Sequence, residues 1–202
     1  MQLNIAQIVT ATEAEGPGVR LAIWLQGCPL RCPGCCNPEM LPFTGGTASS
    51  VDELLAKIDE AARSWGVEGI TLLGGEPFAH AEGAAKLAAA VQQRGLSVMI
   101  FSGYTLAELR AQNDRHVDTL LRHCDILVDG PYLRDQPDTE RRWIGSRNQC
   151  IHCLTDRYRA NDACWQARNT LEIRLTGDEL TVNGFPAPQA VTVWRRPRPV
   201  KP

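Results

Sequence analysis

Three cysteines in one short loop are the residues of this chain that indicate chemistry most clearly. Cys28, Cys32 and Cys35 stand in the run Cys-Pro-Leu-Arg-Cys-Pro-Gly-Cys. Thiolates at this spacing can reach one metal centre, but structural zinc sites usually take four ligands from paired Cys-x2-Cys knuckles. Three thiolates leave one iron of a [4Fe–4S] cluster without a protein ligand, so that a small molecule can bind there and receive an electron. The spacing alone favours an iron–sulfur cluster, with a zinc loop as the alternative.

The bulk composition narrows the classes of protein that this chain can belong to. Its 202 residues are enough for one globular core, and a net charge of −2 creates no general attraction for nucleic acid or acidic lipid. We find no secretory signal pattern and no apolar run long enough for a membrane span, so we expect a cytoplasmic protein. In that compartment thiols stay reduced, and eight cysteines indicate metal or redox chemistry rather than disulfide bonds.

Continuous apolar runs alternate with amphipathic segments along the first two thirds of the chain. This order predicts an α/β fold built on a parallel sheet. Capping-box pairs, Ser50 with Glu53 and Thr105 with Glu108, mark the starts of two helices, and a break in the second is expected near Asn113. The expected strands are 3–9, 19–25, 69–73, 96–101 and 125–128, and the expected helices are 50–65, 81–94 and 105–124.

Glycines and acidic residues directly follow three of these predicted strands. They are Gly74-Gly75-Glu76, Ser102-Gly103 and Asp129-Gly130. Ligands bind at the carboxyl ends of the strands in parallel sheets. We therefore expect these segments to converge on one site together with the cysteine loop.

The remainder of the chain has a different character. Residues 132–169 are polar and predicted to be irregular, whereas 171–175 and 180–185 flank a turn and predict an antiparallel hairpin. Residues 191–194 are a candidate edge strand, and the basic, proline-rich tail 195–202 is expected to be disordered. We divide the chain into a core of residues 1–149 and an extension of residues 150–202 that carries the hairpin.

Several motifs together resemble the radical S-adenosylmethionine superfamily. Cys-x3-Cys-x2-Cys is its cluster motif, and Gly74-Gly75-Glu76-Pro77 is similar to its segment for the methionyl amino group. Further segments resemble its branch of glycyl-radical activating enzymes, in which the activators of anaerobic ribonucleoside-triphosphate reductases are found. These segments are 16–20 (GPGVR), 101–105 (FSGYT), 129–132 (DGPY) and 143–149 (WIGSRNQ). The resemblance implies an incomplete (β/α) partial TIM-type barrel with an irregular C-terminal region and the hairpin.

The resemblance also implies a site. The cluster ligands are Cys28, Cys32 and Cys35, and no side chain needs to act as a general base or nucleophile, because the abstracting species is a nucleoside radical. The residues implied to contact S-adenosylmethionine are Gly34, Cys35, Cys36, Gly74, Gly75, Glu76, Pro77, Ser102 and Asp129.

Some of these assignments have a physical reason and an alternative. A carboxylate at Glu76 suits an ammonium group, and glycines let the backbone approach a ligand; a plain strand-end turn is the alternative. Cys36 departs from the aromatic or histidine residue common in the family, and we interpret it as a thiol that lines the pocket. Ser102 contacts the ligand or opens a helix, and Asp129 binds a ligand or caps a turn.

The implied activity is the reductive cleavage of S-adenosylmethionine to a 5′-deoxyadenosyl radical, which then installs a glycyl radical on a partner enzyme. A flavodoxin or ferredoxin is the expected reductant, and neither nucleic acid nor membrane is an expected partner. Two alternatives remain open. The radical enzyme acts on a small molecule or peptide, or the chain is a non-enzymatic zinc or iron–sulfur module.

A second group of cysteines lies outside the family pattern. Cys150, Cys153 and Cys164, with His152 between the first two, have the residue types for zinc or a second cluster. Unrelated buried thiols are the alternative, and no fourth ligand is evident.

Overall fold

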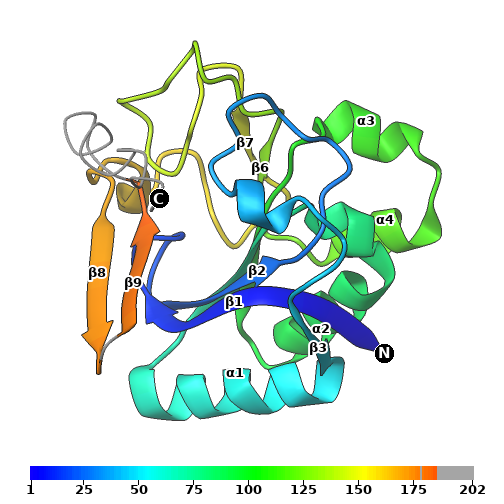
Figure 1. Ribbon diagram of the computed structural model, residues 1–202, viewed down its shortest axis with the longest axis vertical. Helices are drawn as coiled ribbons and strands as arrows, with labels where there is room; N and C mark the ends of the chain where they lie inside the picture. Colours follow the sequence, from blue (N-terminus) through cyan, green and yellow to red (C-terminus); the bar gives the residue numbers. More distant parts are fainter. Residues whose placement is uncertain (178, 186–202) are drawn as a thin grey trace, which may run out of the picture.

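The computed structural model describes residues 1–177 and 179–185 and has a mixed α/β architecture with one large sheet (Figure 1). Seven strands form that sheet in the order β3-β1-β2-β4-β5-β6-β7, and a separate hairpin pairs β8 with β9. The strands are β1 (Gln2–Thr12), β2 (Arg20–Leu25), β3 (Thr47–Ser50), β4 (Gly69–Gly74), β5 (Ser97–Phe101), β6 (Ile126–Asp129), β7 (Cys150–Cys153), β8 (Leu171–Thr176) and β9 (Glu179–Gly184). The α-helices are α1 (Val51–Trp65), α2 (Ala81–Gln93), α3 (Leu106–Ala111) and α4 (Arg115–Arg122). The short helical turns are η1 (Pro38–Met40), η2 (Pro77–His80) and η3 (Ala163–Trp165).

The centre of the sheet is parallel, as predicted, but its flanks are not. Strands β2, β4, β5 and β6 run parallel in register. Strands β1 and β7 pair antiparallel with β2 and β6, and β3 pairs antiparallel with β1, so the sheet is mixed. Two of these strands were not predicted. The sequence of β3, Thr-Ala-Ser-Ser, is polar and partly exposed, and β7 is a short edge strand with a histidine, so neither has an apolar pattern to mark it.

The helices begin and end where the sequence predicts. Both capping boxes form, at Ser50 with Glu53 and at Thr105 with Glu108. The expected break falls at Asn113, which has φ 51° and separates α3 from α4. Asn accepts the left-handed conformation more readily than most residues, which explains why the helix ends there.

Alternating residues of the central strands divide the core into two layers. Ile23, Leu72, Ile100 and Leu127 pack against the helices, in the larger apolar cluster. Residues on the opposite face of the same strands form two smaller clusters, around Trp24 and around Met99. Fully buried Trp143, from the irregular region, packs on Met99. The irregular region therefore covers part of the face that the helices leave open.

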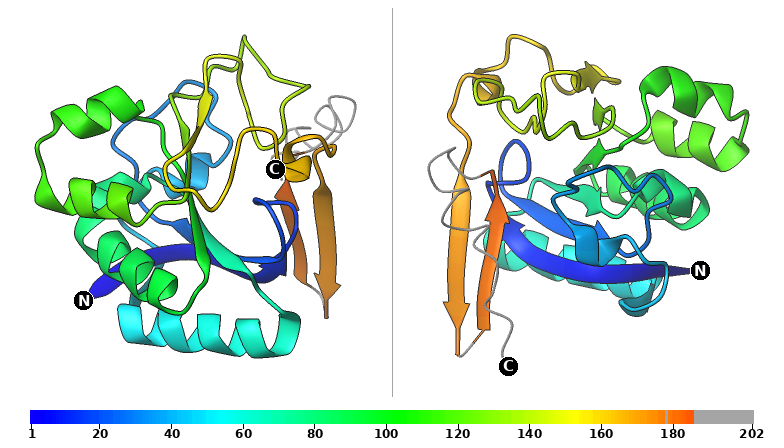
Figure 2. Two further views of the ribbon diagram at one scale, coloured as in Figure 1. Left: turned by 180° about the vertical axis from the view of Figure 1, so that it is seen from behind. Right: turned by 45° about the horizontal axis from the view of Figure 1, so that its top comes forward.

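The predicted hairpin is present and is attached to the loop after β1 (Figure 2). Asn183 donates to Thr12 Oγ1 over 2.9 Å, and Glu172 accepts the Glu13 backbone N–H over 2.8 Å. Phe185, directly after β9, packs against Phe101 with ring centroids 6.3 Å apart. The predicted edge strand 191–194 and the tail 195–202 lie outside the described residues. In the part of the chain that the structure describes, we find no helix with the length and apolarity to span a membrane.

Candidate functional site

The cysteine loop leaves the sheet at the carboxyl end of β2 and returns to the same place. Gly27 N–H donates to Met40 O over 2.8 Å, and Cys28 N–H donates to Leu41 O over 3.0 Å. The buried side chain of Gln26 fastens the far side of the loop by donating to Pro42 O over 2.7 Å. Because both ends of the loop are fixed, its cysteines stand directly over the end of the central strands.

The three predicted ligands lie within one another's electrostatic reach. Burial raises the pKa of the Cys28 thiol, and the nearby Leu30 and Arg31 backbone N–H groups oppose that rise. Burial likewise raises the pKa of Cys35, whose Sγ accepts the Asn37 N–H over 3.4 Å. Backbone donors aimed at cysteine sulfurs favour thiolates and are a known means of setting cluster potentials. The loop therefore suits an iron–sulfur cluster, in which each thiolate binds its own iron.

Within residues 1–177 and 179–185, no three His, Cys, Asp or Glu side chains are arranged to hold a single metal ion. Cys150 and Cys153 are three residues apart on β7, so they face opposite sides of the strand. Among these residues, neither Cys28, Cys32 and Cys35 nor Cys150, Cys153 and Cys164 stand as three ligands of one metal ion, and only the first three share a loop that suits a cluster.

Glu76 lies at the end of β4 beside the cysteine loop and is fully buried. Its backbone N–H donates to Gly27 O over 2.9 Å, next to Cys28. Its Oε1 accepts the Phe78 N–H over 2.9 Å and the Ser102 hydroxyl over 3.0 Å, and its Oε2 accepts the Gly103 N–H over 2.9 Å. A carboxylate has about four lone-pair positions, so one position on Oε2 remains for a further donor.

The surroundings of the Glu76 carboxyl favour the binding of a cation beside it. Burial raises the pKa of its carboxyl to about 7, and the three hydrogen bonds only partly offset this effect. A positive group placed at Oε2 would favour the ionised form and lower that pKa. The carboxyl is therefore in a place where binding of an ammonium group would be coupled to its ionisation.

The other predicted strand-end residues also gather here. Ser102 is buried and bonded to Glu76, as described. Asp129 is buried at the end of β6, and its Oδ2 accepts the Leu106 N–H over 2.6 Å. Asp129 thus holds the first turn of α3, which is the capping alternative weighed for it from the sequence. Gly74 and Gly75 pack against the end of β2 and residue 27, and Pro77 begins η2 directly after Glu76.

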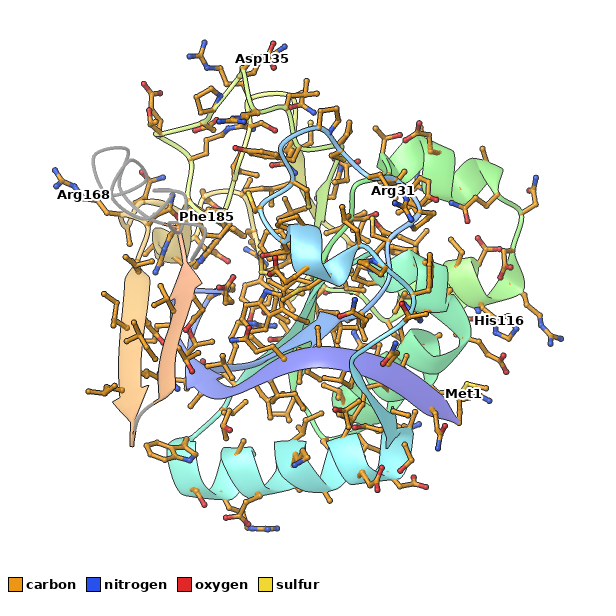
Figure 3. The ribbon with its side chains drawn as sticks, viewed as in Figure 1. Met1, Arg31, His116, Asp135, Arg168 and Phe185 are labelled. Atoms are coloured by element: carbon orange, nitrogen blue, oxygen red, sulfur yellow. The ribbon has the colours of Figure 1, made fainter. Side chains whose placement is uncertain are left out.

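A groove adjoins the cysteine loop. A cavity of about 510 Å³ is lined by Pro33 and Gly34 on one side and by residues 132–135 on the other. The side chain of Arg134 lies across Gly34, which has φ 76° and no room for a β-carbon. In Figure 3, Arg31 marks the cysteine loop and Asp135 marks the facing segment, both at the end of the molecule opposite α1. Cys36 is exposed near this loop, so its role in lining a pocket stays a prediction.

The 143–149 motif fixes the 129–132 motif, whose Tyr132 lines this groove. Gln149 Oε1 accepts the Gly145 and Ser146 N–H groups, and its Nε2 donates to Gly130 O over 3.0 Å. Asn148 Nδ2 donates to Pro131 O over 2.7 Å, and Ser146 Oγ accepts the Leu133 N–H over 3.1 Å. The polar residues of the 143–149 motif therefore fix the segment 130–133 beside the cluster loop.

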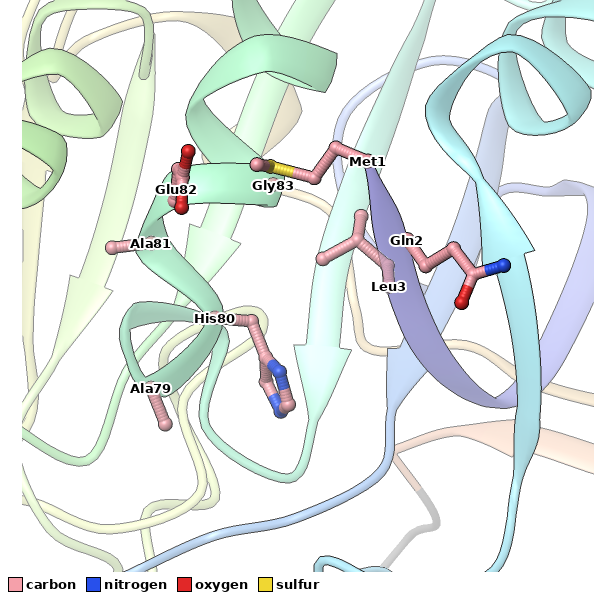
Figure 4. A pocket seen from close by; sticks show the side chains of 8 residues that line it. All are labelled: Met1, Gln2, Leu3, Ala79, His80, Ala81, Glu82 and Gly83. Carbon is pink, nitrogen blue, oxygen red and sulfur yellow. The ribbon is translucent and has the colours of Figure 1, made fainter.

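A second cavity, of about 240 Å³, lies apart from this site. It opens between the start of β1 and the first turn of α2, and Figure 4 shows His80 and Leu3 on its walls. None of the predicted site residues lines it.

The segment 102–103 was expected at the site, but the individual roles of Gly103 and Leu30 were not predicted from the sequence. Gly103 supplies a backbone donor to Glu76, and Leu30 of the cysteine loop packs against Gly103 at a point that a β-carbon would occupy. The Ser-Gly pair directly after a predicted strand was the sequence signal for Gly103. No sequence signal marked Leu30, because its role depends on how the loop folds back over β5.

Comparisons with known proteins give a family model, a set of relatives and one solved structure. The family model described as a 4Fe-4S single cluster domain matches residues 14–152. The anaerobic ribonucleoside-triphosphate reductase-activating protein of Vibrio cholerae is 31% identical over 160 residues, which cover 76% of this chain and 99% of that protein. The protein of the same description from Salmonella typhimurium is 32% identical over 148 residues, or 69% of this chain and 92% of that one. Among solved structures, QueE from Escherichia coli aligns with 52% of this chain and 54% of its own, at 26% identity and a TM-score of 0.42.

The family match contains the whole cysteine loop and all three strand-end segments, and the first two relatives align over nearly their entire length. This chain belongs to the 4Fe-4S single cluster domain family and, within it, to the radical S-adenosylmethionine activating enzymes represented by the anaerobic ribonucleoside-triphosphate reductase-activating proteins.

Proposed function

We propose that this enzyme cleaves S-adenosylmethionine reductively and installs a glycyl radical on an anaerobic ribonucleotide reductase. Cys28, Cys32 and Cys35 would hold the 4Fe–4S cluster of the family. When bound, the cluster supplies the electron with which S-adenosylmethionine is cleaved to a 5′-deoxyadenosyl radical. The observation that carries the proposal is the fully buried Glu76, joined through Gly27 to the cysteine loop and held by donors from the end of β5.

The role of Glu76 is to bind and orient the methionyl ammonium. Burial leaves the negative charge of the Glu76 carboxylate uncompensated, and a cation bound at the remaining lone-pair position on Oε2 would compensate it. A charge-assisted hydrogen bond there fixes the direction of the amino acid part of the ligand. Gly34 and Cys36 stand beside the third ligand, where the adenosine part would lie.

The remaining residues position the ligand and limit access of water. Leu30 packs over Gly103, next to Glu76, and keeps the carboxylate out of solvent. The groove between Gly34 and residues 132–135 lies next to the proposed ligands and is open to a chain from outside. We assign it to the glycine-bearing segment of the partner. Among the residues that the structure describes, the sheet begins at β3 and ends at β7 without closing, which supports an incomplete (β/α) barrel with an open side for that segment.

The cluster also determines which cellular compartment and which electron donor we propose. A cluster held by thiolates needs a reducing compartment, so we propose a cytoplasmic enzyme. A flavodoxin or ferredoxin would deliver the electron.

The test is anaerobic reconstitution with iron and sulfide, followed by reduction in the presence of S-adenosylmethionine. We expect 5′-deoxyadenosine from the wild type and from Cys150→Ala, and none from Cys32→Ala. Adding a candidate reductase should give a glycyl-radical EPR doublet. A reconstituted cluster with no 5′-deoxyadenosine contradicts the proposal, whereas 5′-deoxyadenosine without the doublet favours a small-molecule or peptide substrate.

A further inference from the structure

A close contact joins Asp129, at the end of β6, to His152 on β7. His152 Nε2 lies 3.0 Å from Asp129 Oδ2, and the side chains are 31% and 7% exposed. Leu127 is the direct partner of His152 in the strand pair, so His152 and Asp129 are diagonal neighbours on one face of the sheet. The approach is not aligned as a hydrogen bond, so the ring and the carboxylate are in close contact without a bond between them.

The same carboxylate oxygen holds the loop that follows β5. Asp129 Oδ2 accepts the N–H of Leu106, the first residue of α3, over 2.6 Å. The backbone of β6 fixes this loop at two further points, because Ser102 N–H donates to Val128 O over 2.9 Å and Gly130 N–H donates to Tyr104 O over 3.1 Å. The end of β6 thus determines where residues 102–106 lie.

That loop supplies two of the three donors to Glu76. The Ser102 hydroxyl and the Gly103 N–H each hold one carboxylate oxygen. The Ser102 oxygen also accepts the Tyr104 N–H over 3.1 Å, which orients its own hydrogen toward Glu76. A displacement of the first turn of α3 would move both donors together.

We propose that His152 is a positioning residue for S-adenosylmethionine binding, acting through Asp129. Its imidazole confines the Asp129 carboxylate against α3, which sets the two donors that orient Glu76. The inference rests on the proposed function, in which Glu76 binds the methionyl ammonium. It also gives His152 a role other than the metal ligation considered from the sequence, since its ring is turned to Asp129.

The test measures the dissociation constant of S-adenosylmethionine by anaerobic calorimetry on the reconstituted holoenzyme. We expect His152→Ala and Asp129→Asn each to raise that constant about tenfold, and the double variant to bind no more weakly than Asp129→Asn alone. The control His123→Ala removes a half-buried histidine that contacts Gln92, distant from this network, and should bind as the wild type does.

A purely structural role would give a different pattern. It would lower the midpoint of thermal unfolding and the iron content of His152→Ala, while the surviving holoenzyme would bind S-adenosylmethionine normally. If the double variant raised the dissociation constant of S-adenosylmethionine about a hundredfold, the product of the two single effects, the two residues would act separately. Either result overturns the inference.

Two further measurements keep the test decisive. If His152→Ala does not hold its cluster, His152→Gln keeps a side chain that can contact Asp129, and its dissociation constant for S-adenosylmethionine should stay within about threefold of the wild-type value. A tenfold rise of that constant in His152→Gln also overturns the inference. The EPR spectrum of the reduced cluster should change on adding S-adenosylmethionine to the wild type and less so in His152→Ala. A wild-type holoenzyme that does not bind S-adenosylmethionine contradicts the proposed function itself.

Discussion

Ser102 donates its hydroxyl hydrogen to Glu76 across 3.0 Å in a fully enclosed setting, joining the ends of β5 and β4. The bond holds Oε1 of the same carboxylate whose Oε2 the proposed ammonium would approach. Burial pushes the Glu76 carboxyl toward its neutral form, and this donor is one of three that favour its ionised form. The ability of Glu76 to receive a cation therefore depends on Ser102.

Ser102→Ala should weaken S-adenosylmethionine binding. Removing a donor from a buried carboxylate costs about 1–3 kcal/mol, which corresponds to a rise in the dissociation constant of about fivefold to 150-fold. Anaerobic calorimetry on the holoenzyme measures this dissociation constant. The matched control is Ser64→Ala, which removes a hydroxyl bonded to Glu60 on the exposed surface of α1. Equal binding by wild type and Ser102→Ala would show that Glu76 does not depend on this donor.

The two groups of cysteines should respond differently to substitution. Cys28→Ala removes a buried thiol at the fixed end of the loop, and we expect it to lose its iron and sulfide after reconstitution. The double variant Cys150→Ala/Cys153→Ala should retain a full cluster, because both residues lie on β7 and face opposite sides of it. Iron and sulfide analysis measures the cluster content of both variants. Loss of all iron from the double variant would mean that β7 contributes ligands.

The central strands and the helix starts could be predicted because local chemistry determines them. Buried parallel strands are apolar throughout, and a capping box such as Thr105 with Glu108 satisfies its own backbone groups. The convergence of Glu76 with Ser102 followed from the general position of ligands at strand ends. These features depend little on the register in which neighbouring strands pair.

The parts that could not be predicted depend on tertiary register. Strand β7 has no apolar alternation, and it is a strand because β6 offers it an open edge. The contact of His152 with Asp129 exists only for the register that pairs His152 with Leu127. Nothing in the order of residues 150–153 distinguishes this arrangement from a metal-binding turn.

Gly75→Ala should disrupt the junction between β4 and the cysteine loop. A β-carbon at residue 75 would lie 2.3 Å from the carbonyl oxygen of Gly27, a backbone atom that cannot move without shifting Cys28. Such overpacking typically costs about 1–3 kcal/mol, and here it should also lower the cluster content. Thermal unfolding and iron analysis measure the two effects. Gly95→Ala, where a β-carbon meets nothing within 4 Å, should lose some stability from its φ of 77° and keep its cluster. Full iron content in Gly75→Ala would contradict the expectation.

The buried carboxyl of Glu15 should make stability depend on pH. Burial raises its pKa from 4.5 to about 7, against the lowering effect of the Gly184 N–H, which donates to Oε1 over 2.6 Å. The folded state therefore binds the proton more tightly than the unfolded state. The resulting stability is complete below about pH 4.5 and is lost as the pH rises to about 7, by on the order of 3 kcal/mol.

Glu15→Gln isolates this contribution, because an amide keeps an acceptor for Gly184 and does not titrate. We expect its free energy of unfolding to exceed that of the wild type increasingly between pH 5 and pH 7. Anaerobic urea denaturation at several pH values measures the difference, with Glu60→Gln on the exposed face of α1 as the control. Parallel curves for wild type and Glu15→Gln would show that the hairpin does not bury a titrating carboxyl. A difference that opens across this range would instead show that the extension, through Gly184, encloses Glu15 in solution.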